Sequence, residues 1–292
     1  MRRPILLAVL FCSLLVSVSC TPQLPAPEPP ESSNAIIPEP PSSELKVHFI
    51  DVGQGDSILI DLDNIEILID GGDRSPGVLA YLEKHVDKPL EVMIATHPHA
   101  DHLGGLIEVL DEFEVREIWH NGDTHDTKTY QDFVAAVESE NAEVHIAKLH
   151  DTIDAGELSL YVHHPSRTFD SINNNSIVLH LAYGKTDFLF TGDAEREAEG
   201  AMMALSSVRI PDVEILKVGH HGSKTASSKD FLAITSPEIA IYMAKEDNSY
   251  GHPHAETIAA LTEIGAEIYG TDVNGSIVVA SDGEVYELQF ER

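Results

Sequence analysis

From residue 45 onward, short apolar runs alternate with longer segments of helical spacing. The short runs predict strands at 46–52, 58–62, 66–69, 91–95, 115–120, 158–163, 176–181, 187–191, 214–218, 239–243, 268–269, 276–280 and 285–290. Apolar residues at helical spacing predict helices at 77–85, 103–114, 129–141, 194–205, 229–234 and 255–264. Two strand-rich halves that each carry helices favour an α+β fold with two sheets packed face to face and helices outside. We expect one domain over residues 45–292.

The first 44 residues have a different composition. A basic start, Met1–Arg3, precedes an apolar run from Pro4 to Ser19, which is too short for a membrane span and is typical of a secretory signal over residues 1–19. Cys20 follows small residues, as in bacterial lipoprotein signals; the alternative is an ordinary cleaved signal with an incidental cysteine. Residues 20–44 are rich in proline and predict an extended, disordered tether. We therefore expect an exported protein, either lipid-anchored through Cys20 at a cell surface or secreted.

The charge balance is strongly acidic, with 49 acidic and 18 basic residues and a formal net charge of −31. Such a charge repels polyanions at long range, so a nucleic-acid substrate has to be argued from a site rather than from the surface. The two cysteines, Cys12 and Cys20, both precede the expected domain. That domain therefore uses neither disulfides nor thiolate metal ligands. No sequence feature indicates a protein partner.

One short segment carries the strongest chemical signal. Residues 97–102 read His-Pro-His-Ala-Asp-His and lie between the strand expected at 91–95 and the helix expected at 103–114. His97 and His99 stand two apart, so in an extended backbone their rings leave the same side, and the turn can bring Asp101 and His102 back to the same point. Imidazole and carboxylate groups bind borderline divalent metals, and three protein ligands with one open position suit a catalytic zinc. The segment predicts a metal site.

Further polar residues follow other predicted strands and can reach the same sheet edge. They are His164, Asp193, the pair His220 and His221, and His252. Asp193 either bridges two cations or caps the helix after it. His163 and His164 are either site residues or surface histidines. Because adjacent side chains cannot easily point the same way, we expect one of His220 and His221 to be a ligand, with His220 preferred.

The wider pattern resembles the metallo-β-lactamase superfamily, and most closely the hydrolase domain of the ComEC/Rec2 competence proteins. The resemblance rests on residues 51–57, 68–72, 97–102, 173–176, 191–193, 219–224 and 248–253. It implies a four-layer αββα sandwich with two divalent metal ions, Zn or Mn, in an edge groove. By the same resemblance, the first ion would be held by His97, His99 and His164, the second by Asp101, His102 and His220, with Asp193 between them. Asp70 resembles the buried carboxylate that orients ligand histidines.

These residues support a hypothesis about the reaction. Two cations about 3.5–4 Å apart lower the pKa of a bound water and neutralise charge on a phosphoryl oxygen. We therefore expect an exported metal-dependent phosphodiesterase or nuclease that acts on DNA or another phosphodiester through a metal-activated water. Asp101 would accept a hydrogen bond from the nucleophile, and His252 or His221 would protonate the leaving group. The expected substrate contacts are Asn175, Ser176, Ser223 and Lys224, although an asparagine run is as often a turn.

Two alternatives stay open. The same ligands could serve the hydrolysis of a carbonyl substrate such as a lactone, a thioester or a β-lactam. A non-cleaving extracellular DNA-binding module is the other alternative, which the intact ligand set and the acidity disfavour. The shape and polarity of the groove would discriminate between these substrates.

Overall fold

The computed structural model describes residues 43–75, 77–205, 207 and 209–292. The expected signal segment, the expected tether up to residue 42 and Cys20 lie outside these residues. Within the described ranges, no helix combines the length and the apolar character that a membrane crossing requires.

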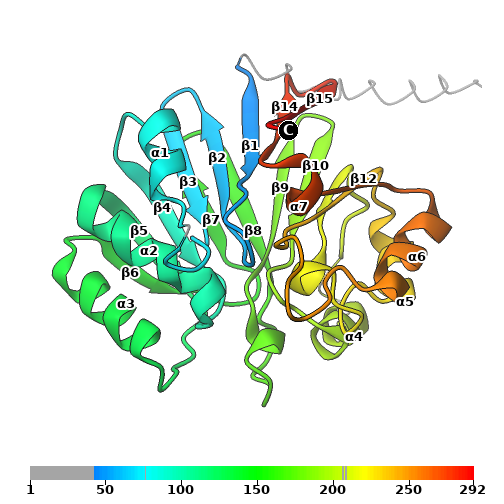
Figure 1. The fold of residues 1–292 in the computed structure, drawn as a ribbon, viewed down its shortest axis with the longest axis horizontal. Coiled ribbons are helices and arrows are strands. Elements are labelled where there is room, and N and C mark those ends of the chain that lie inside the picture. Colours follow the sequence, from blue (N-terminus) through cyan, green and yellow to red (C-terminus); the bar gives the residue numbers. More distant parts are fainter. Residues whose placement is uncertain (1–42, 76, 206, 208) are drawn as a thin grey trace, which may run out of the picture. The chain divides into compact units, whose positions relative to one another are not determined.

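The described chain forms two β-sheets (Figure 1). The first sheet has the strand order β15-β14-β1-β2-β3-β4-β5-β6, and its strands are β1 (Leu45–Phe49), β2 (Ile58–Leu62), β3 (Ile65–Ile69), β4 (Leu90–Ala95), β5 (Val115–His120), β6 (Glu143–Ile146), β14 (Ile277–Ser281) and β15 (Tyr286–Phe290). The second sheet has the order β13-β12-β11-β10-β9-β8-β7, and its strands are β7 (Thr152–Ala155), β8 (Leu158–His164), β9 (Val178–Tyr183), β10 (Thr186–Phe190), β11 (Ile215–Lys217), β12 (Ile239–Tyr242) and β13 (Glu267–Gly270). Because β14 pairs with β1, the last two strands return to the sheet that the first strand begins.

Helices cover the outer face of each sheet (Figure 1). The first sheet is covered by α1 (Leu79–His85), α2 (Ala100–Glu112) and α3 (Lys128–Ser139), and the second by α4 (Arg196–Ala204), α5 (Lys229–Thr235) and α6 (Ala255–Ile264). The short helix α7 (Thr271–Asn274) and two 3₁₀ turns, η1 (Asn173–Asn175) and η2 (Gly219–Gly222), lie in connections. The predicted four-layer αββα sandwich is confirmed.

Three apolar clusters hold the layers together. The central cluster lies between the sheets, where the ring centroids of Phe49 and Phe190 are 6.3 Å apart. Each outer cluster joins one sheet to its helices. In strand β4 the structure explains why residues 92–95 form an unbroken apolar run: Val92 and Ile94 face the central cluster, whereas Met93 and Ala95 face the helices. Burial on both faces therefore removes the alternation that marks a half-exposed strand.

The topology brings polar residues from both sheets to one edge. Strands β3 to β6 are parallel in the first sheet, and β10 to β13 are parallel in the second. Parallel strands end at the same sheet edge, so residues that follow them converge there. Asp70 follows β3 and His97 follows β4, while Asp193 follows β10 and His220 follows β11. Each sheet thus supplies two neighbouring strand ends to the candidate site.

The sequence analysis misses two strands, β6 and β7, which lie at the edges of the sheets. In β6 the apolar residues Val144 and Ile146 are 46% and 52% exposed. Strand β6 therefore buries little of its surface, and β7 buries only Ile153 and Ala155, so both apolar patterns are short. The missed strands lengthen both sheets without changing the predicted layers.

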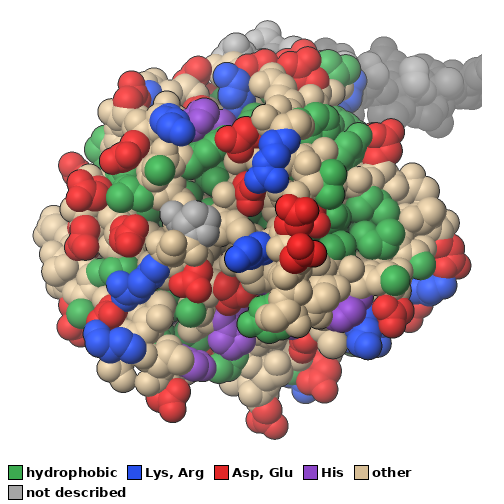
Figure 2. Space-filling model, in the orientation of Figure 1, with side chains coloured by type: hydrophobic (Ala, Val, Ile, Leu, Met, Phe, Trp, Pro, Cys, Tyr) green, Lys and Arg blue, Asp and Glu red, His purple; other side chains and the backbone are tan. Residues whose placement is uncertain are grey.

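The surface view shows no single basic patch on the face drawn (Figure 2). Acidic side chains are spread over this face, with fewer basic side chains between them. This distribution agrees with the formal net charge of −31. Attraction of a polyanion would therefore have to come from a local site.

His163, on the helix-covered side of β8, provides a test of how burial affects pH stability. It is 4% exposed, and neither ring nitrogen has a hydrogen-bond partner in the described part of the chain. Burial, with smaller contributions from His180 and His150, lowers its pKa from 6.5 to about 4. Because the folded state disfavours the protonated ring, we expect stability to be lost as the pH falls from 6.5 towards 4.

We predict that His163→Phe removes about 2 kcal/mol of this acid destabilisation. Urea unfolding of the parent and the variant at pH 7 and pH 4.5 measures the difference. His145→Phe, at a partly exposed histidine, is the matched control. Equal pH dependence in the parent and His163→Phe would contradict the prediction.

Candidate metal centre

The first part of the site is the loop from β4 into α2. His97 is 1% exposed, and His99 is the N-cap residue of α2, so Asp101 and His102 lie in the first helical turn. Nε2 of His97 and Nδ1 of His99 are 3.0 Å apart, which directs both rings to one point. The predicted convergence within residues 97–102 is therefore seen in the structure.

Asp70 holds this loop in place through buried hydrogen bonds. It is fully buried, and its carboxylate accepts hydrogen bonds from the Thr96 backbone N–H at 2.8 Å and the Thr96 hydroxyl at 2.6 Å. Nδ1 of His102 lies 2.7 Å from the same carboxylate. This contact orients the ring so that Nε2 faces the site.

Two glycine pairs let the start of α2 approach the sheet closely. Gly71 N donates to His102 O at 2.8 Å, and Gly105 N donates to Gly72 O at 3.0 Å. A Cβ atom on Gly105 would lie 2.1 Å from Gly71 O. Any side chain there would push α2, and with it Asp101 and His102, away from the remaining ligands.

Asp193 lies at the centre of the site and is 2% exposed. Its Oδ2 is 3.7 Å from Nε2 of His97, and its Oδ1 is 3.4 Å from Nε2 of His102. Ser176 supports the loop by accepting a hydrogen bond from the Asp193 backbone N–H at 3.1 Å. One carboxylate thus faces two separate groups of histidines.

His220 and His221 divide between the two oxygens of Asp193. Nε2 of His220 is 3.7 Å from Oδ2, the oxygen that faces His97, and Nε2 of His221 is 3.4 Å from Oδ1, the oxygen that faces His102. Nε2 of His221 is also 3.4 Å from Oδ2 of Asp101. The structure therefore places His221, and not the preferred His220, beside Asp101 and His102.

The backbone explains this difference from the expectation. Both histidines are left-handed, with φ of 48° at His220 and 55° at His221. Successive left-handed residues are rare outside glycine, and they turn both adjacent rings towards Asp193. The assumption that adjacent side chains point apart holds for a strand and fails in this turn.

The residues that face Oδ1 of Asp193 have the features of a cation site. Within the described residues, three buried atoms there have no hydrogen-bond partner: His102 Nε2, Asp193 Oδ1 and His221 Nε2. Ligand atoms of these residues and of Asp56 lie within 4.8 Å of one another, and those of His97, His99 and Asp193 do likewise. Buried polar atoms normally have partners, so a shared set without partners fits bound metal ions.

The electrostatics point the same way. Burial alone would raise the pKa of Asp193, but the charges of His221, His102 and His220 outweigh it and hold that pKa well below its usual value. Burial would lower the pKa of His102 and His221, but nearby carboxylates, Asp193 first, raise both well above the usual value. The carboxylates therefore draw positive charge into the site, which divalent cations would supply in compact form.

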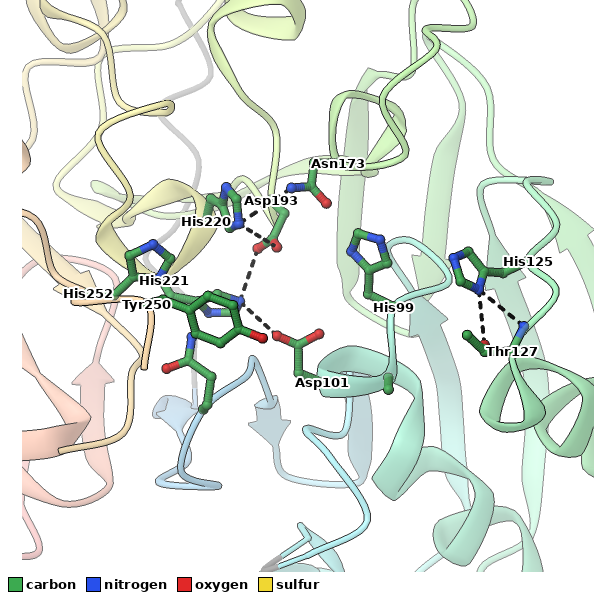
Figure 3. A pocket seen from close by; sticks show the side chains of 12 residues that line it. His99, Asp101, His125, Thr127, Asn173, Asp193, His220, His221, Tyr250 and His252 are labelled. Carbon is green, nitrogen blue, oxygen red and sulfur yellow. Dashed lines mark hydrogen bonds and ion pairs between the residues drawn. The ribbon is translucent and has the colours of Figure 1, made fainter. Parts of the chain in front are cut away.

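A cavity of about 350 Å³ opens beside these groups (Figure 3). Figure 3 shows His220, His221 and His252 on one side and His99 and His125 on the other, with Asp193 and Asp101 between them. The rest of the wall includes Gln54, His125, Thr127, Asn173, Tyr250 and His252. Residues from both sheets thus face one open pocket.

Several expected site residues have structural contacts instead. His164 is fully buried; its Nε2 lies 2.8 Å from Asn174 O and its Nδ1 accepts from Ser166 N at 3.2 Å. With both nitrogens engaged, it joins neither group. The side chain of Asn175 accepts a hydrogen bond from Phe169 N and donates to Phe169 O and to the Asp123 carboxylate.

The other expected substrate contacts also lie off the cavity wall. Ser176 supports Asp193, as described above, and Ser223 lies 2.9 Å from the Thr225 hydroxyl. Lys224 is exposed and lines a neighbouring groove with Arg196. The wall residues that sequence reasoning missed include His125 and Thr127, which no motif marks, and Tyr250, which lies inside the segment 248–253.

A family model described as the metallo-beta-lactamase superfamily matches residues 50–244. The match covers most of the chain and includes every residue of the two groups. The chain therefore belongs to the metallo-β-lactamase superfamily. That fold implies divalent metal ions, and the groups around Asp193 are the residues that could hold them.

Two competence proteins are also similar, which confirms the predicted relationship to the ComEC/Rec2 family. ComE operon protein 3 from Bacillus subtilis is 31% identical over 260 residues and covers 81% of this chain, and Recombination protein 2 from Haemophilus influenzae is 29% identical over 254 residues and covers 85%. The chain spans only 33% and 30% of their lengths. The solved structure of the metallo-beta-lactamase fold protein YhfI from Bacillus subtilis is also similar, with a TM-score of 0.54 at 15% identity. The match covers 82% of this chain and 100% of the YhfI chain, and it shows the shared fold alone.

Proposed function

We propose that this metal-dependent hydrolase is a phosphodiesterase that cleaves nucleic acid. The observation that carries the proposal is the position of Asp193, whose two oxygens face two histidine groups. A carboxylate shared in this way is suited to two neighbouring cations, the arrangement used for in-line displacement at phosphorus. The names of the competence-protein relatives support a nucleic-acid substrate.

The proposed ligands fall into two sets. The first ion, Zn or Mn, would be held by His97, His99 and Asp193, with His220 facing the same carboxylate oxygen. The second would be held by Asp101, His102, Asp193 and His221. When bound, the ions would acidify a water molecule and neutralise charge on the phosphodiester.

His252 is the remaining candidate for proton transfer. It is 9% exposed and lines the cavity, and its Nδ1 has no hydrogen-bond partner among the described residues. Burial, followed by the charges of His220 and His221, lowers its pKa to about 4. The ring is therefore neutral at pH 7, and donation to a leaving group requires the negative charge of a bound phosphodiester to raise this pKa. His221, with both nitrogens facing polar partners, is proposed as a ligand only.

The cavity rim offers a surface for a nucleobase. Tyr250 is 64% exposed and stacks on His252 with ring centroids 5.6 Å apart. Asn248 braces this loop, because its side chain bonds to Lys245 O, His252 O, Tyr250 N and His252 N. An exposed aromatic ring on a rigid loop beside a phosphodiester site is suited to base stacking.

We predict that Tyr250→Ala raises KM for single-stranded DNA about tenfold with little change in kcat, since stacking contributes about 1–3 kcal/mol per base. Steady-state kinetics with a short labelled oligonucleotide measure both constants. Tyr250→Phe, which keeps the ring, should behave like the parent. An unchanged KM in Tyr250→Ala would exclude stacking at this residue.

The proposed function is tested with the purified chain after metal removal and reloading with Zn or Mn. Single- and double-stranded DNA, RNA and bis(p-nitrophenyl) phosphate are offered beside a lactone, a thioester and a β-lactam. We expect phosphodiester cleavage that chelation abolishes and metal restores. Turnover of a carbonyl substrate with all phosphodiesters intact would refute the proposal.

Export and anchoring through Cys20 belong to the same proposal. They are supported by the apolar run at 4–19 and the proline-rich residues that follow. Membrane fractionation of cells that express the parent or Cys20→Ala tests the anchor.

A further inference from the structure

Lys217, the last residue of β11, is a buried cation that the proposed reaction does not use. It is 0% exposed. Its ammonium group forms an ion pair with Asp56 and donates a hydrogen bond to Gly192 O at 2.9 Å. Asp56, 1% exposed, lies in the connection between β1 and β2 of the first sheet, whereas Lys217 ends a strand of the second sheet.

Stability alone is a weak reason for this pair. Removing two charges from water is costly, and apolar residues of similar size often replace a buried ion pair without loss of stability. Lysine side chains are also rarely fully buried in proteins. The contacts of the pair indicate a role other than stability.

Each partner is tied to a segment that carries proposed ligands. Asp56 N donates to Asp101 O at 3.3 Å, and Gly72 N donates to Asp56 O at 2.8 Å, so Asp56 is fixed to the start of α2. On the other side, Lys217 holds the carbonyl of Gly192, the residue before Asp193. The ion pair therefore joins the ligand segments of the two sheets.

The pair also reaches His221. Nδ1 of His221 lies 3.2 Å from Oδ1 of Asp56 and 3.0 Å from Met243 O. The arrangement parallels Asp70 behind His102, where the carboxylate lies 2.7 Å from Nδ1. In both cases a buried carboxylate faces the ring nitrogen opposite to the one that faces Asp193.

We propose that Lys217 is a positioning residue for the second metal site. Its ammonium group holds Asp56 in place behind His221, and it holds the loop that presents Asp193. Loss of Lys217 weakens metal binding by Asp101, His102, Asp193 and His221 more than by His97 and His99. The inference rests on the proposed metal sites and is independent of the phosphodiester substrate.

The test compares the full-length parent, Lys217→Met, the isosteric neutral double variant Asp56→Asn/Lys217→Met, and Lys185→Met. Lys185 is an exposed lysine paired with Glu284 and serves as the matched control. Cobalt(II) is titrated into each metal-free protein, and its visible absorption reports the number and affinity of bound ions. Urea unfolding of the metal-free proteins is measured in parallel.

We expect Lys217→Met to lower the affinity for one of two cobalt ions about 10- to 100-fold, the range for residues that support metal ligands. Lys217→Met should also be less stable, because Asp56 is left unpaired. The double variant should recover stability and keep the weak cobalt site, a combination that a merely structural charge balance does not produce. If Lys217→Met does not fold, the cobalt affinity of the double variant still tests the positioning role.

Parental cobalt affinity in the double variant would overturn the inference. A parent that binds no cobalt would overturn the metal sites together with it. Two cobalt ions in the parent with no cleavage of any phosphodiester would refute the proposed substrate alone.

Discussion

Asp193→Ala is expected to lower kcat/KM for phosphodiester cleavage at least about 10³-fold, equivalent to ~4 kcal/mol of transition-state stabilisation. The carboxylate faces Nε2 of His97 and His220 through one oxygen and Nε2 of His102 and His221 through the other. Its removal deletes the group shared by both proposed ions. Metal analysis and steady-state kinetics on the same preparation measure the two losses.

Asp111→Ala is the control for this variant, because Asp111 is an exposed residue on α2. It should keep parental activity and metal content. Circular dichroism of Asp193→Ala checks that the sandwich is intact. Two bound ions and more than about a tenth of the parental rate in Asp193→Ala would contradict a shared carboxylate.

Asp70→Ala is expected to reduce both metal affinity and stability. It leaves the Thr96 N–H, the Thr96 hydroxyl and Nδ1 of His102 without their buried partner. We expect about 3 kcal/mol of lost unfolding free energy, since each unsatisfied buried group costs about 1–3 kcal/mol. Metal affinity should fall about 10- to 100-fold, because His102 is no longer oriented.

Urea unfolding and metal titration measure these effects. Asp87→Ala removes a carboxylate with 86% side-chain exposure and should change neither. Asp70→Asn keeps the side-chain volume and an acceptor for Thr96, so it should recover part of the stability while the metal affinity stays low. Parental metal affinity in Asp70→Asn would show that the charge of Asp70 has no part in orienting His102.

The proposed site has a similar construction on its two sides. In the first sheet, His102 has Asp70 behind it, and in the second, His221 has Asp56 behind it. Asp70 and His102 are 32 positions apart but follow the neighbouring strands β3 and β4 of one sheet. The Asp56 part joins the two sheets, which is why the sequence analysis did not assign Asp56 a role.

The layers were predictable because they depend on local patterns. Strand β4 is buried on two faces and helix α2 on one, and the spacing of apolar residues in each segment shows this burial. Strand β6 was missed because it buries little surface, and β7 because it has only four residues, of which Ile153 and Ala155 are buried. Their formation depends on pairing with a neighbour, which a local pattern does not record.

From the sequence we predicted residues 97–102 as a metal-binding segment and Asp193 as a candidate bridge, and we identified the metallo-β-lactamase fold and the family relationship. Only the folded chain shows that His221 and not His220 lies beside Asp101 and His102, that His164 is engaged elsewhere, and that Lys217 and Asp56 join the two sheets. The physical reason is that ligand identity in a compact motif follows from residue type and spacing. The direction of each side chain depends instead on backbone angles and on contacts between distant segments, such as the left-handed turn at residues 220 and 221.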